Sequence, residues 1–332
     1  MNIEKSNNIF IGIEGGATNT NGVLFDSNGN TLAALSIKGS NLAVYQQVAA
    51  ERICFLIQEL IKKARIDSES IKCIGLGIAG SSNEDGRDLL FKELDKINLS
   101  NKTLLSNDAE AAYQVCCPKN EGLLITVGTG VICIARNQSG KLFRTAGKGH
   151  HSGDIGSGFW IASQAIIKLS MQDEISLNNP TDSKEILDII YKVLEIDNLD
   201  DDLDRILKSS EAVREVASLS KYIINLANEN NEVALSIIQE ATTAISDYII
   251  ELIDKLGYES DEIILAANGS IMKNKFFRKA LNDALQFDFS KINWIVSKVS
   301  PAYGAAILAA KYKNINLKIS DIIKGSNFES NS

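Results

Sequence analysis

The chain has 332 residues, a length that suits one large domain or two ordinary ones. Hydrophobic residues make up 45% and charged residues 23% of the chain, values typical of a globular protein that exclude intrinsic disorder. The formal net charge is −8. The chain therefore lacks the basic surface that neutralises a nucleic-acid backbone, and nucleic acid is not an expected partner.

The sequence carries no sign of a membrane or of secretion. No stretch reaches the roughly 18 consecutive apolar residues of a membrane span, and residues 1–8 lack the basic start and apolar centre of a secretion signal. An odd number of cysteines lies in apolar segments without a Cys-x-x-Cys pair: Cys54, Cys73, Cys116, Cys117 and Cys133. We expect reduced thiols, a cytoplasmic protein and no membrane partner.

The first half of the chain predicts strands followed by alternating helices and strands. Apolar runs that end at glycine or asparagine turns predict the strands, and apolar residues at helical spacing predict the helices. In chain order we expect strands over 9–13, 21–26 and 31–37, a helix over 44–64, a strand over 73–78, a helix over 85–96, a strand over 103–106 and a helix over 108–116.

The second half repeats this order around a long helical insertion. We expect strands over 123–127, 131–136 and 141–146, a glycine-rich loop over 147–158, helices over about 157–256, a strand over 262–267, a helix from about 274, a strand over 292–296 and a helix over 301–312.

This repetition predicts two similar α/β domains that face each other. Residues 1–118 would form the first domain and residues 119–318 the second, with the helical insert at about 157–256. Residues 319–332 read as a loose polar tail.

Each half has a glycine turn directly after its first strand. Glycine lets the backbone approach a phosphate with its amides pointing at the oxygens. Neither turn is a Walker loop, and neither fits the dinucleotide fingerprint, in which a helix follows the glycines. A single turn of this kind is usually an ordinary hairpin, but two turns at equivalent places predict phosphate binding. The residues expected to bind phosphate are Gly15, Gly16, Ala17, Thr18 and Asn19 in the first half and Gly128, Thr129 and Gly130 in the second.

Several segments together resemble the actin/hexokinase/Hsp70 nucleotide-binding superfamily. Within it the chain is similar to the N-acetylglucosamine kinase branch, the BadF/BadG/BcrA/BcrD ATPase family, which also contains activator ATPases. The matching segments are 12–20, 75–80, 106–109, 124–130, 153–161, 268–271 and 301–306.

The resemblance implies a fold and a chemistry. The fold is α/β, with two ribonuclease-H-like (actin-like ATPase) domains, each a mixed five-stranded sheet with helices, and a helical insert in the second. The chemistry is phosphoryl transfer that uses ATP and Mg²⁺. Gly269 and Ser270 would lie on the adenosine side of the nucleotide.

The resemblance also assigns the catalytic carboxylates. Asp108 falls on the family's catalytic aspartate and would accept the proton of the sugar hydroxyl; from the residues alone, an N-cap aspartate is the alternative. Glu14 stands where the family usually has an aspartate that orients Mg²⁺ through water. Asn19 and Val131 replace residues that often bond phosphate or sugar, which warns of a weaker or altered enzyme.

The sugar side is assigned by the same resemblance. Asn41 and Asp154 match the residues that bind sugar hydroxyls, a task that suits amide and carboxylate groups, and Thr129 and Asp108 would also face the sugar. Lys148 takes the place of a tryptophan beside the N-acetyl group. It would either pair with a substrate carboxylate, such as the lactyl ether of N-acetylmuramic acid, or point into solvent.

Two further features of this loop differ from what a sugar-binding or metal-binding loop would show. Ile155 replaces a glutamate that follows the second sugar carboxylate in the family. His150 and His151 are adjacent and have no cysteine cluster nearby, so we expect a flexible loop near the substrate rather than a metal site.

The sequence therefore predicts an ATP-dependent kinase that phosphorylates the 6-hydroxyl of an amino sugar: N-acetylglucosamine, N-acetylmuramic acid or glucosamine. We expect a homodimer with a small-molecule sugar as its substrate. Two alternatives stay open. One is an activator ATPase that holds a [4Fe–4S] cluster through Cys116, Cys117 or Cys133, and the other is a sugar-binding sensor without catalysis.

Overall fold

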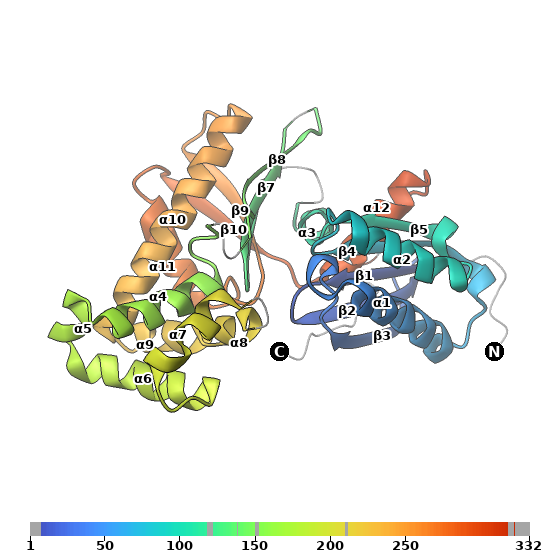
Figure 1. Cartoon of the computed structure of the whole chain (residues 1–332). Helices are drawn as coiled ribbons and strands as arrows, with labels where there is room; N and C mark the ends of the chain where they lie inside the picture. The colour runs from blue at the N-terminus through green and yellow to red at the C-terminus, as the bar shows by residue number, and fades with distance from the viewer. Residues whose placement is uncertain are drawn as a thin grey trace. The chain divides into compact units, whose positions relative to one another are not determined.

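The computed structural model describes residues 8–117, 122–137, 139–149, 153–209, 212–317 and 322, which fall into two compact units. Unit 1 combines Met1–Lys119 with Ser297–Ser332, and unit 2 is Asn120–Val296. Each unit contains one five-stranded sheet (Figure 1).

Unit 1 places its central strands in parallel and its first three strands in an antiparallel meander. The sheet order is β3-β2-β1-β4-β5, with β4 parallel to both β1 and β5. Its elements are β1 (Ile9–Gly15), β2 (Asn19–Asp26), β3 (Thr31–Lys38), α1 (Leu42–Ala64), η1 (Ser68–Ser70), β4 (Ile71–Ile78), α2 (Glu84–Lys96), η2 (Ser100–Lys102), β5 (Thr103–Ser106), α3 (Asp108–Cys116) and α12 (Pro301–Tyr312).

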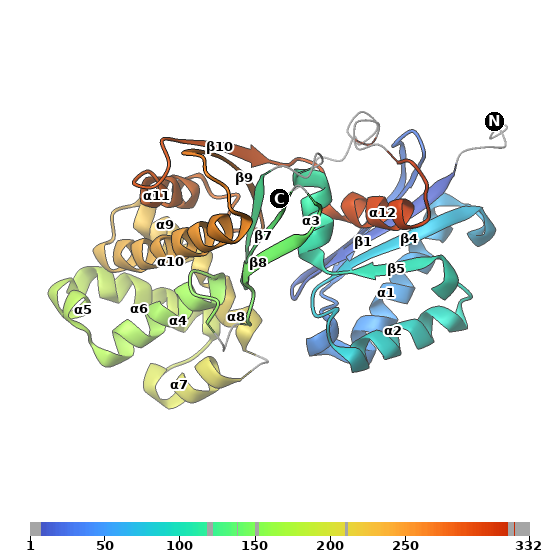
Figure 2. The same ribbon diagram turned by 90° about the horizontal axis from the view of Figure 1, so that it is seen from above.

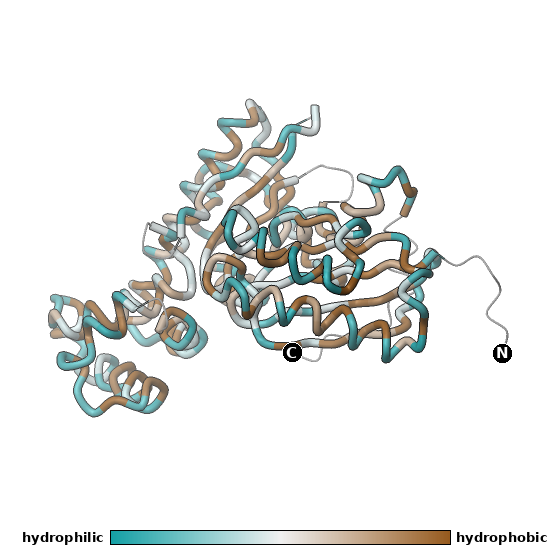
Figure 3. The backbone as a smooth tube through the Cα atoms, turned by 45° about the vertical axis from the view of Figure 1, so that its right-hand side comes forward, coloured by the Kyte–Doolittle hydropathy of each residue, from teal (hydrophilic) through white to brown (hydrophobic). Residues whose placement is uncertain are grey.

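Helices cover both faces of this first sheet. Figure 2 shows α1 and α2 on one side of it and α3 and α12 on the other. Side chains alternate along β1, so Ile11 and Ile13 join the core under α1 and α2, while Gly12 faces α12. Figure 3 shows hydrophobic and hydrophilic residues alternating along the helices, as expected where one helical face covers a sheet.

Glycine allows α12 to lie unusually close to the first sheet. A Cβ atom at Gly12 would lie 1.9 Å from the carbonyl oxygen of Ala302, and one at Gly75 would lie 1.9 Å from that of Ala305. Tyr303, on the same helix, hydrogen-bonds through its hydroxyl to Thr31 Oγ1 at 2.6 Å. The helix is therefore locked to β1 and β4 by backbone contact and to β3 by a buried tyrosine.

The structure corrects the predicted domain boundary at this helix. The sequence analysis placed residues 297–318 in the second domain, whereas Ser297–Ser332 belongs to unit 1. The reason is the close packing of α12 on β1 and β4, which the linear order of elements does not reveal. Of the predicted tail 319–332, only Ile322 is described, and its apolar side chain is buried rather than loose in solvent.

Unit 2 repeats the sheet of unit 1. Its order is β10-β9-β6-β7-β8, with β6, β7 and β8 antiparallel and β9 parallel to both β6 and β10. The strands are β6 (Leu123–Val127), β7 (Val131–Arg136), β8 (Leu142–Ala146), β9 (Glu262–Asn268) and β10 (Lys291–Val296), and α11 (Lys275–Leu285) joins the last two. The predicted α/β fold of two mixed five-stranded sheets with helices is confirmed.

A helical segment lies between β8 and β9, where the sequence predicted an insert. Its elements are α4 (Gly158–Met171), α5 (Glu174–Asn178), α6 (Pro180–Leu194), α7 (Leu199–Lys208), α8 (Val213–Ser218), α9 (Ser220–Asn228) and α10 (Glu232–Leu256). Helix α10 packs along β7 and β8 and also contacts α4 and α9, so it joins the insert to the second sheet. No helix in the described part of the chain is long and apolar enough to cross a membrane.

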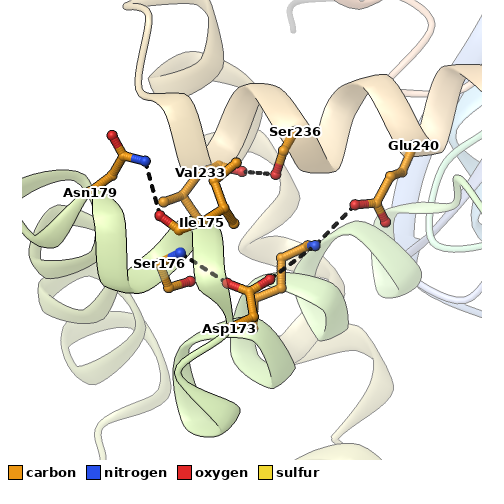
Figure 4. Close-up of polar contacts among 8 residues, drawn as sticks. Asp173, Ile175, Ser176, Asn179, Val233, Ser236 and Glu240 are labelled. Carbon is orange, nitrogen blue, oxygen red and sulfur yellow. Dashed lines mark hydrogen bonds and ion pairs between the residues drawn. The ribbon is translucent and has the colours of Figure 1, made fainter.

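A mostly buried lysine ties three helical segments of the insert together (Figure 4). Lys168 Nζ, near the end of α4, lies 3.2 Å from Asp173 Oδ2 and 3.0 Å from Glu240 Oε1 on α10. Asp173 also caps α5 by accepting a hydrogen bond from the Ser176 amide at 2.9 Å. Burial opposes the charge of Lys168, but its hydrogen bonds with Glu240 and Asp173 outweigh that effect and raise its pKa.

The close contact of α12 predicts a large cost for a methyl group on β1. Gly12→Ala would place a Cβ 1.9 Å from the Ala302 carbonyl oxygen, and relieving this overlap should cost about 2 kcal/mol or more of unfolding free energy. Gly16→Ala is the control, because a Cβ there has no heavy atom within 4 Å. Urea unfolding measures both, and equal destabilisation by the two variants would contradict this account of the packing.

Candidate active site

The candidate residues of unit 1 gather at one edge of its sheet. Gly15 at the end of β1 pairs with Ile78 at the end of β4, and Gly77 pairs with Ser106 at the end of β5. These strands are parallel, so the residues that follow each of them meet at the same edge. This is where open α/β sheets bind ligands.

The first glycine turn has its carbonyl groups tied back to the chain that follows β3. The Ser40 amide donates to Gly16 O at 3.0 Å, and the Tyr45 hydroxyl donates to Ala17 O at 3.0 Å. In a planar trans peptide, the N–H points away from the C=O of the same unit. The Ala17 and Thr18 amides therefore point to the other side of the loop, where two successive N–H groups can hold an anion.

The segment after β3, residues 39–41, packs tightly against this turn. The Gly39 amide donates to Thr18 O at 2.9 Å, and a Cβ at Gly39 would lie 2.1 Å from Ala17 O. The buried Thr20 hydroxyl donates to Ser40 Oγ at 2.7 Å. The predicted phosphate loop and the predicted sugar-binding segment are thus one interlocked structure.

Asn41 caps the helix that follows. Its Oδ1 accepts hydrogen bonds from the amides of Ala43, at 2.9 Å, and Val44, at 3.3 Å, and so starts α1. Gly80, with φ of 74°, passes close to the same oxygen. Capping uses Oδ1 and leaves the Nδ2 group of Asn41 as the donor for a ligand.

Asp108 is the first residue of α3 and not its cap. Asn107 is the N-cap: its Oδ1 accepts from the Glu110 amide at 2.7 Å, while its Nδ2 donates to Glu110 Oε1 at 3.1 Å. The N-cap alternative for Asp108 is therefore wrong. Burial raises the pKa of the Asp108 carboxyl, against smaller opposing effects of the Ala109 and Asp108 amides. A carboxylate with a raised pKa is a better proton acceptor than an ordinary aspartate.

Glu14 lies on β1 directly opposite Asn21 on β2. The Asn21 side chain donates from Nδ2 to Glu14 Oε2 at 3.1 Å. Glu14 is partly buried and sits one residue before Gly15, so its carboxylate lies at the start of the first phosphate loop.

The two carbonyls of the second glycine turn, in unit 2, also accept hydrogen bonds from a later segment of the chain. The Gly158 amide donates to Gly128 O at 2.7 Å and the Phe159 amide donates to Thr129 O at 3.2 Å, both from the start of α4. By the same planarity argument, the Thr129 and Gly130 amides point away from α4. Both units therefore present a pair of successive amides at equivalent positions.

Asp154 and Lys148 lie beside this second turn. Buried Asp154 accepts, at Oδ1, the amides of Lys148 at 2.8 Å and Gly149 at 3.2 Å. A Cβ at Gly130 would lie 3.1 Å from Asp154 Oδ2, so the carboxylate rests against the turn. The Lys148 backbone is thus fixed next to Asp154 while the residue stays exposed.

Gly269 and Ser270 complete the group in unit 2. Gly269 has φ of 90°, and a Cβ there would lie 2.3 Å from Val127 O, the carbonyl that accepts the Ile271 amide at 3.1 Å. The Ser270 hydroxyl oxygen lies 4.0 Å from the Cβ position of Gly128. The turn after β9 therefore borders the turn after β6.

The predicted site residues thus form two groups, one in each unit. Unit 1 brings together Glu14, Gly15, Gly16, Ala17, Thr18, Asn19, Asn41 and Asp108 at the edge of its sheet, and unit 2 brings together Gly128, Thr129, Gly130, Lys148, Asp154, Gly269 and Ser270. His150 and His151 lie outside the described residues.

Two tyrosines that hold these loops were not predicted from the sequence. Tyr45 bonds the first turn, and Tyr248 on α10 donates its hydroxyl to Gly153 O at 3.0 Å, one residue before Asp154. An aromatic residue with a polar tip in the first turn of α1 is a weak signal for Tyr45. Nothing in the sequence around Tyr248 distinguishes it from a core tyrosine.

Known proteins resemble this chain along most of its length. It is 27% identical over 306 residues to the N-acetylmuramic acid/N-acetylglucosamine kinase of Clostridium acetobutylicum, covering 90% of this chain and 97% of that protein. It is 28% identical over 327 residues to the N-acetyl-D-glucosamine kinase of Dictyostelium discoideum, covering 93% and 99% respectively.

Structural comparison supports the fold. The crystal structure of a candidate N-acetylglucosamine kinase from Chromobacterium violaceum superposes with a TM-score of 0.71 at 20% identity, over 91% of this chain and 99% of that one. The family model described as BadF/BadG/BcrA/BcrD ATPase family matches residues 11–309. The chain therefore belongs to the BadF/BadG/BcrA/BcrD ATPase family.

Proposed function

We propose that this protein is an ATP-dependent kinase that phosphorylates the 6-hydroxyl of an amino sugar. The observation that carries the proposal is the matched pair of outward-pointing amides after β1 and β6, at equivalent positions in two similar units. The names of the relatives from Clostridium acetobutylicum and Dictyostelium discoideum support N-acetylglucosamine as a substrate, and that of the former also supports N-acetylmuramic acid.

The backbone amides would hold the nucleotide. Those of Ala17 and Thr18 would bind oxygens of the phosphate chain, as would those of Thr129 and Gly130, with no side chain in the way. The first turn also offers the Thr18 hydroxyl and the exposed Asn19 side chain. Gly269 and Ser270 would lie toward the adenosine end.

Asp108 would act as the general base. Its carboxylate accepts the proton of the 6-hydroxyl while the hydroxyl oxygen bonds to the γ-phosphorus. The bond from that phosphorus to the β–γ bridging oxygen breaks, and ADP leaves. The raised pKa of Asp108 supports this role, because it reduces the difference between the pKa of the base and the pKa of the sugar hydroxyl that must lose its proton.

Glu14 suits a Mg²⁺ ion carried by the nucleotide. Carboxylate oxygens are preferred Mg²⁺ ligands, and nucleotide Mg²⁺ usually takes one or two carboxylates together with phosphates and waters. Among the described residues there is no cluster of three or more acidic, cysteine or histidine side chains that would form a full protein cage. The ion would neutralise charge on the phosphates, with Glu14 orienting one of its waters.

Each unit has polar groups that suit sugar hydroxyls. The Nδ2 group of Asn41 and the carboxylate of Asp154 would each bond ring hydroxyls, and Thr129 would add a hydroxyl. Lys148 is anchored to Asp154 through its backbone, so its ammonium group would reach a carboxylate carried by the sugar. This arrangement would allow N-acetylmuramic acid as a second substrate.

The cysteines favour the kinase over an activator ATPase. Cys116 and Cys117 lie in unit 1 and Cys133 lies in unit 2, and all three are buried. Burial raises the pKa of each thiol to about 12. Iron–sulfur clusters are bound by thiolates, and burial makes the thiolate form of these three residues less accessible than that of an exposed cysteine.

A panel of sugars tests the proposed reaction. We expect ATP- and Mg²⁺-dependent phosphorylation of N-acetylglucosamine and N-acetylmuramic acid and weaker phosphorylation of glucosamine and glucose, measured by coupled ADP release. Mass spectrometry and NMR of the product locate the new phosphate. Binding of these sugars without any stimulated ADP release would contradict the kinase and indicate a sensor.

Replacing Lys148 tests the carboxylate contact. Lys148→Met should raise the KM for N-acetylmuramic acid about 10-fold, the lower end for a charge-assisted hydrogen bond at an exposed site, and should leave the KM for N-acetylglucosamine unchanged. Lys141→Met is the matched control, because Lys141 is an exposed lysine in the turn between β7 and β8, directly before β8. If Lys148→Met changes the KM for both sugars equally, the ammonium group of Lys148 does not bind the carboxylate of N-acetylmuramic acid.

Replacing Asp108 tests the base. Asp108→Asn keeps the shape of the side chain but cannot accept the proton, so kcat should fall about 10²- to 10⁴-fold. Burial disfavours the charged form of Asp108, so the variant should be at least as stable as the parent at pH 7 in thermal unfolding. Turnover near that of the parent would remove Asp108 from the mechanism.

The same residue sets the expected pH dependence. The pKa of Asp108 is raised above the ordinary value of 3.8, so activity should fall as the pH decreases through a range higher than that of an exposed aspartate. This acid limb of the kcat/KM profile should follow protonation of the base. An acid limb at or below the pH range in which an exposed aspartate titrates would contradict the assignment.

A further inference from the structure

The two glycine turns are held by different kinds of donor. At the second turn, backbone amides of α4 bond both carbonyls, Gly128 O and Thr129 O. At the first turn, a backbone amide bonds Gly16 O, but a side chain, the Tyr45 hydroxyl, bonds Ala17 O at 3.0 Å. The direction of the Ala17–Thr18 peptide, and with it the Thr18 N–H, therefore depends on one phenol group.

The backbone around Tyr45 departs from a regular helix. Gln46, the next residue of α1, has φ of 41° and ψ of −113°, so the helical path breaks there. A non-glycine residue rarely adopts a positive φ, and such strain persists only where the surrounding contacts over-determine it. The break sits between the buried first residue, Leu42, and the next buried residue of the helix, Ala49.

Arg52 supports the tyrosine ring from the next turns of α1. Its guanidinium carbon lies 5.1 Å from the centroid of the Tyr45 ring, within the range of a cation–π contact. Its Nη1 also donates to Gly39 O, in the segment that packs on Ala17. Tyr45 is partly buried and packs against the core of unit 1, so the core and Arg52 together hold its ring in place.

We propose that Tyr45 is a positioning residue for phosphate binding. Its hydroxyl fixes the Ala17 carbonyl and thereby aims the Thr18 amide at an oxygen of the nucleotide's phosphate chain, and Arg52 holds the ring for this task. The proposal rests on the proposed function, since it assigns the phosphates of ATP to this turn. It adds a residue of α1 that contacts neither substrate.

Equilibrium binding of ADP tests this role without any need for turnover. Tyr45→Phe keeps the ring and its contact with Arg52 but removes the hydroxyl, so the Kd for ADP should rise about 3- to 10-fold, the effect of one neutral hydrogen bond. The Kd for adenosine, which has no phosphate, and that for N-acetylglucosamine should not change. Isothermal titration calorimetry measures all three.

Two further variants complete the design. Tyr258→Phe is the matched control, because Tyr258 is an exposed tyrosine outside both groups of site residues, and its ADP affinity should equal that of the parent. Arg52→Met removes the charge over the ring and the bond to Gly39 O. It should weaken ADP binding in the same direction as Tyr45→Phe.

The outcomes separate this inference from the proposed function. If the parent protein binds no ADP, the proposed function fails. If the parent binds ADP and Tyr45→Phe binds it equally well, the kinase assignment stands and the positioning role of Tyr45 is wrong. Equal losses for ADP, adenosine and N-acetylglucosamine, together with a lower Tm, would show that Tyr45 only stabilises the fold and would also overturn the inference.

Discussion

The planarity of the peptide bond is the constraint on which the candidate site depends. A loop can point two successive N–H groups at an anion only if the two carbonyls of the same peptide units face the other way and find donors there. Both glycine turns meet this condition, with donors from the chain after β3 in unit 1 and from the start of α4 in unit 2. The proposed phosphate binding would therefore depend on the segments behind the loops as much as on the glycines in them.

Close backbone packing explains other glycines that resemble site residues. Gly75 and Gly77 belong to a segment that matches a nucleotide-binding motif, yet a Cβ at Gly75 would meet the Ala305 carbonyl and one at Gly77 would lie 2.4 Å from the Ala111 Cβ. These glycines admit α12 and α3 to the sheet. Their connection with the site is indirect, since α3 carries Asp108 and its approach to β4 fixes where that carboxylate lies.

The regular elements were predictable because their signals are local. The strands over 103–106, 123–127 and 131–136 and the helices over 108–116 and 301–312 occur with the predicted bounds. Apolar runs and turn residues specify such elements without reference to the rest of the chain. The repeated element order was enough to predict two similar sheets.

Features that depend on distant contacts were not predictable in the same way. No pattern in the sequence of α12 predicts its contact with β1. The small residues of the helix and of the strand indicate close packing only once the fold has brought them together. The Tyr45 hydroxyl reaches Ala17, which lies 28 positions earlier in the chain. The glycine turns were found because glycine itself is the signal, whereas a tyrosine that supports a turn looks like any other aromatic residue of a helix.

Asp108 illustrates how the fold can serve catalysis at a cost to stability. Asn107 and Glu110 form the cap of α3, so the carboxylate of Asp108 is not needed to start the helix. It is nevertheless held where burial raises its pKa, which makes its charged form less favourable than that of an exposed aspartate. A carboxylate that neither caps the helix nor gains stability from its charge fits the proposed role as a base. The local structure of unit 1 and the family resemblance thus point independently to the same residue.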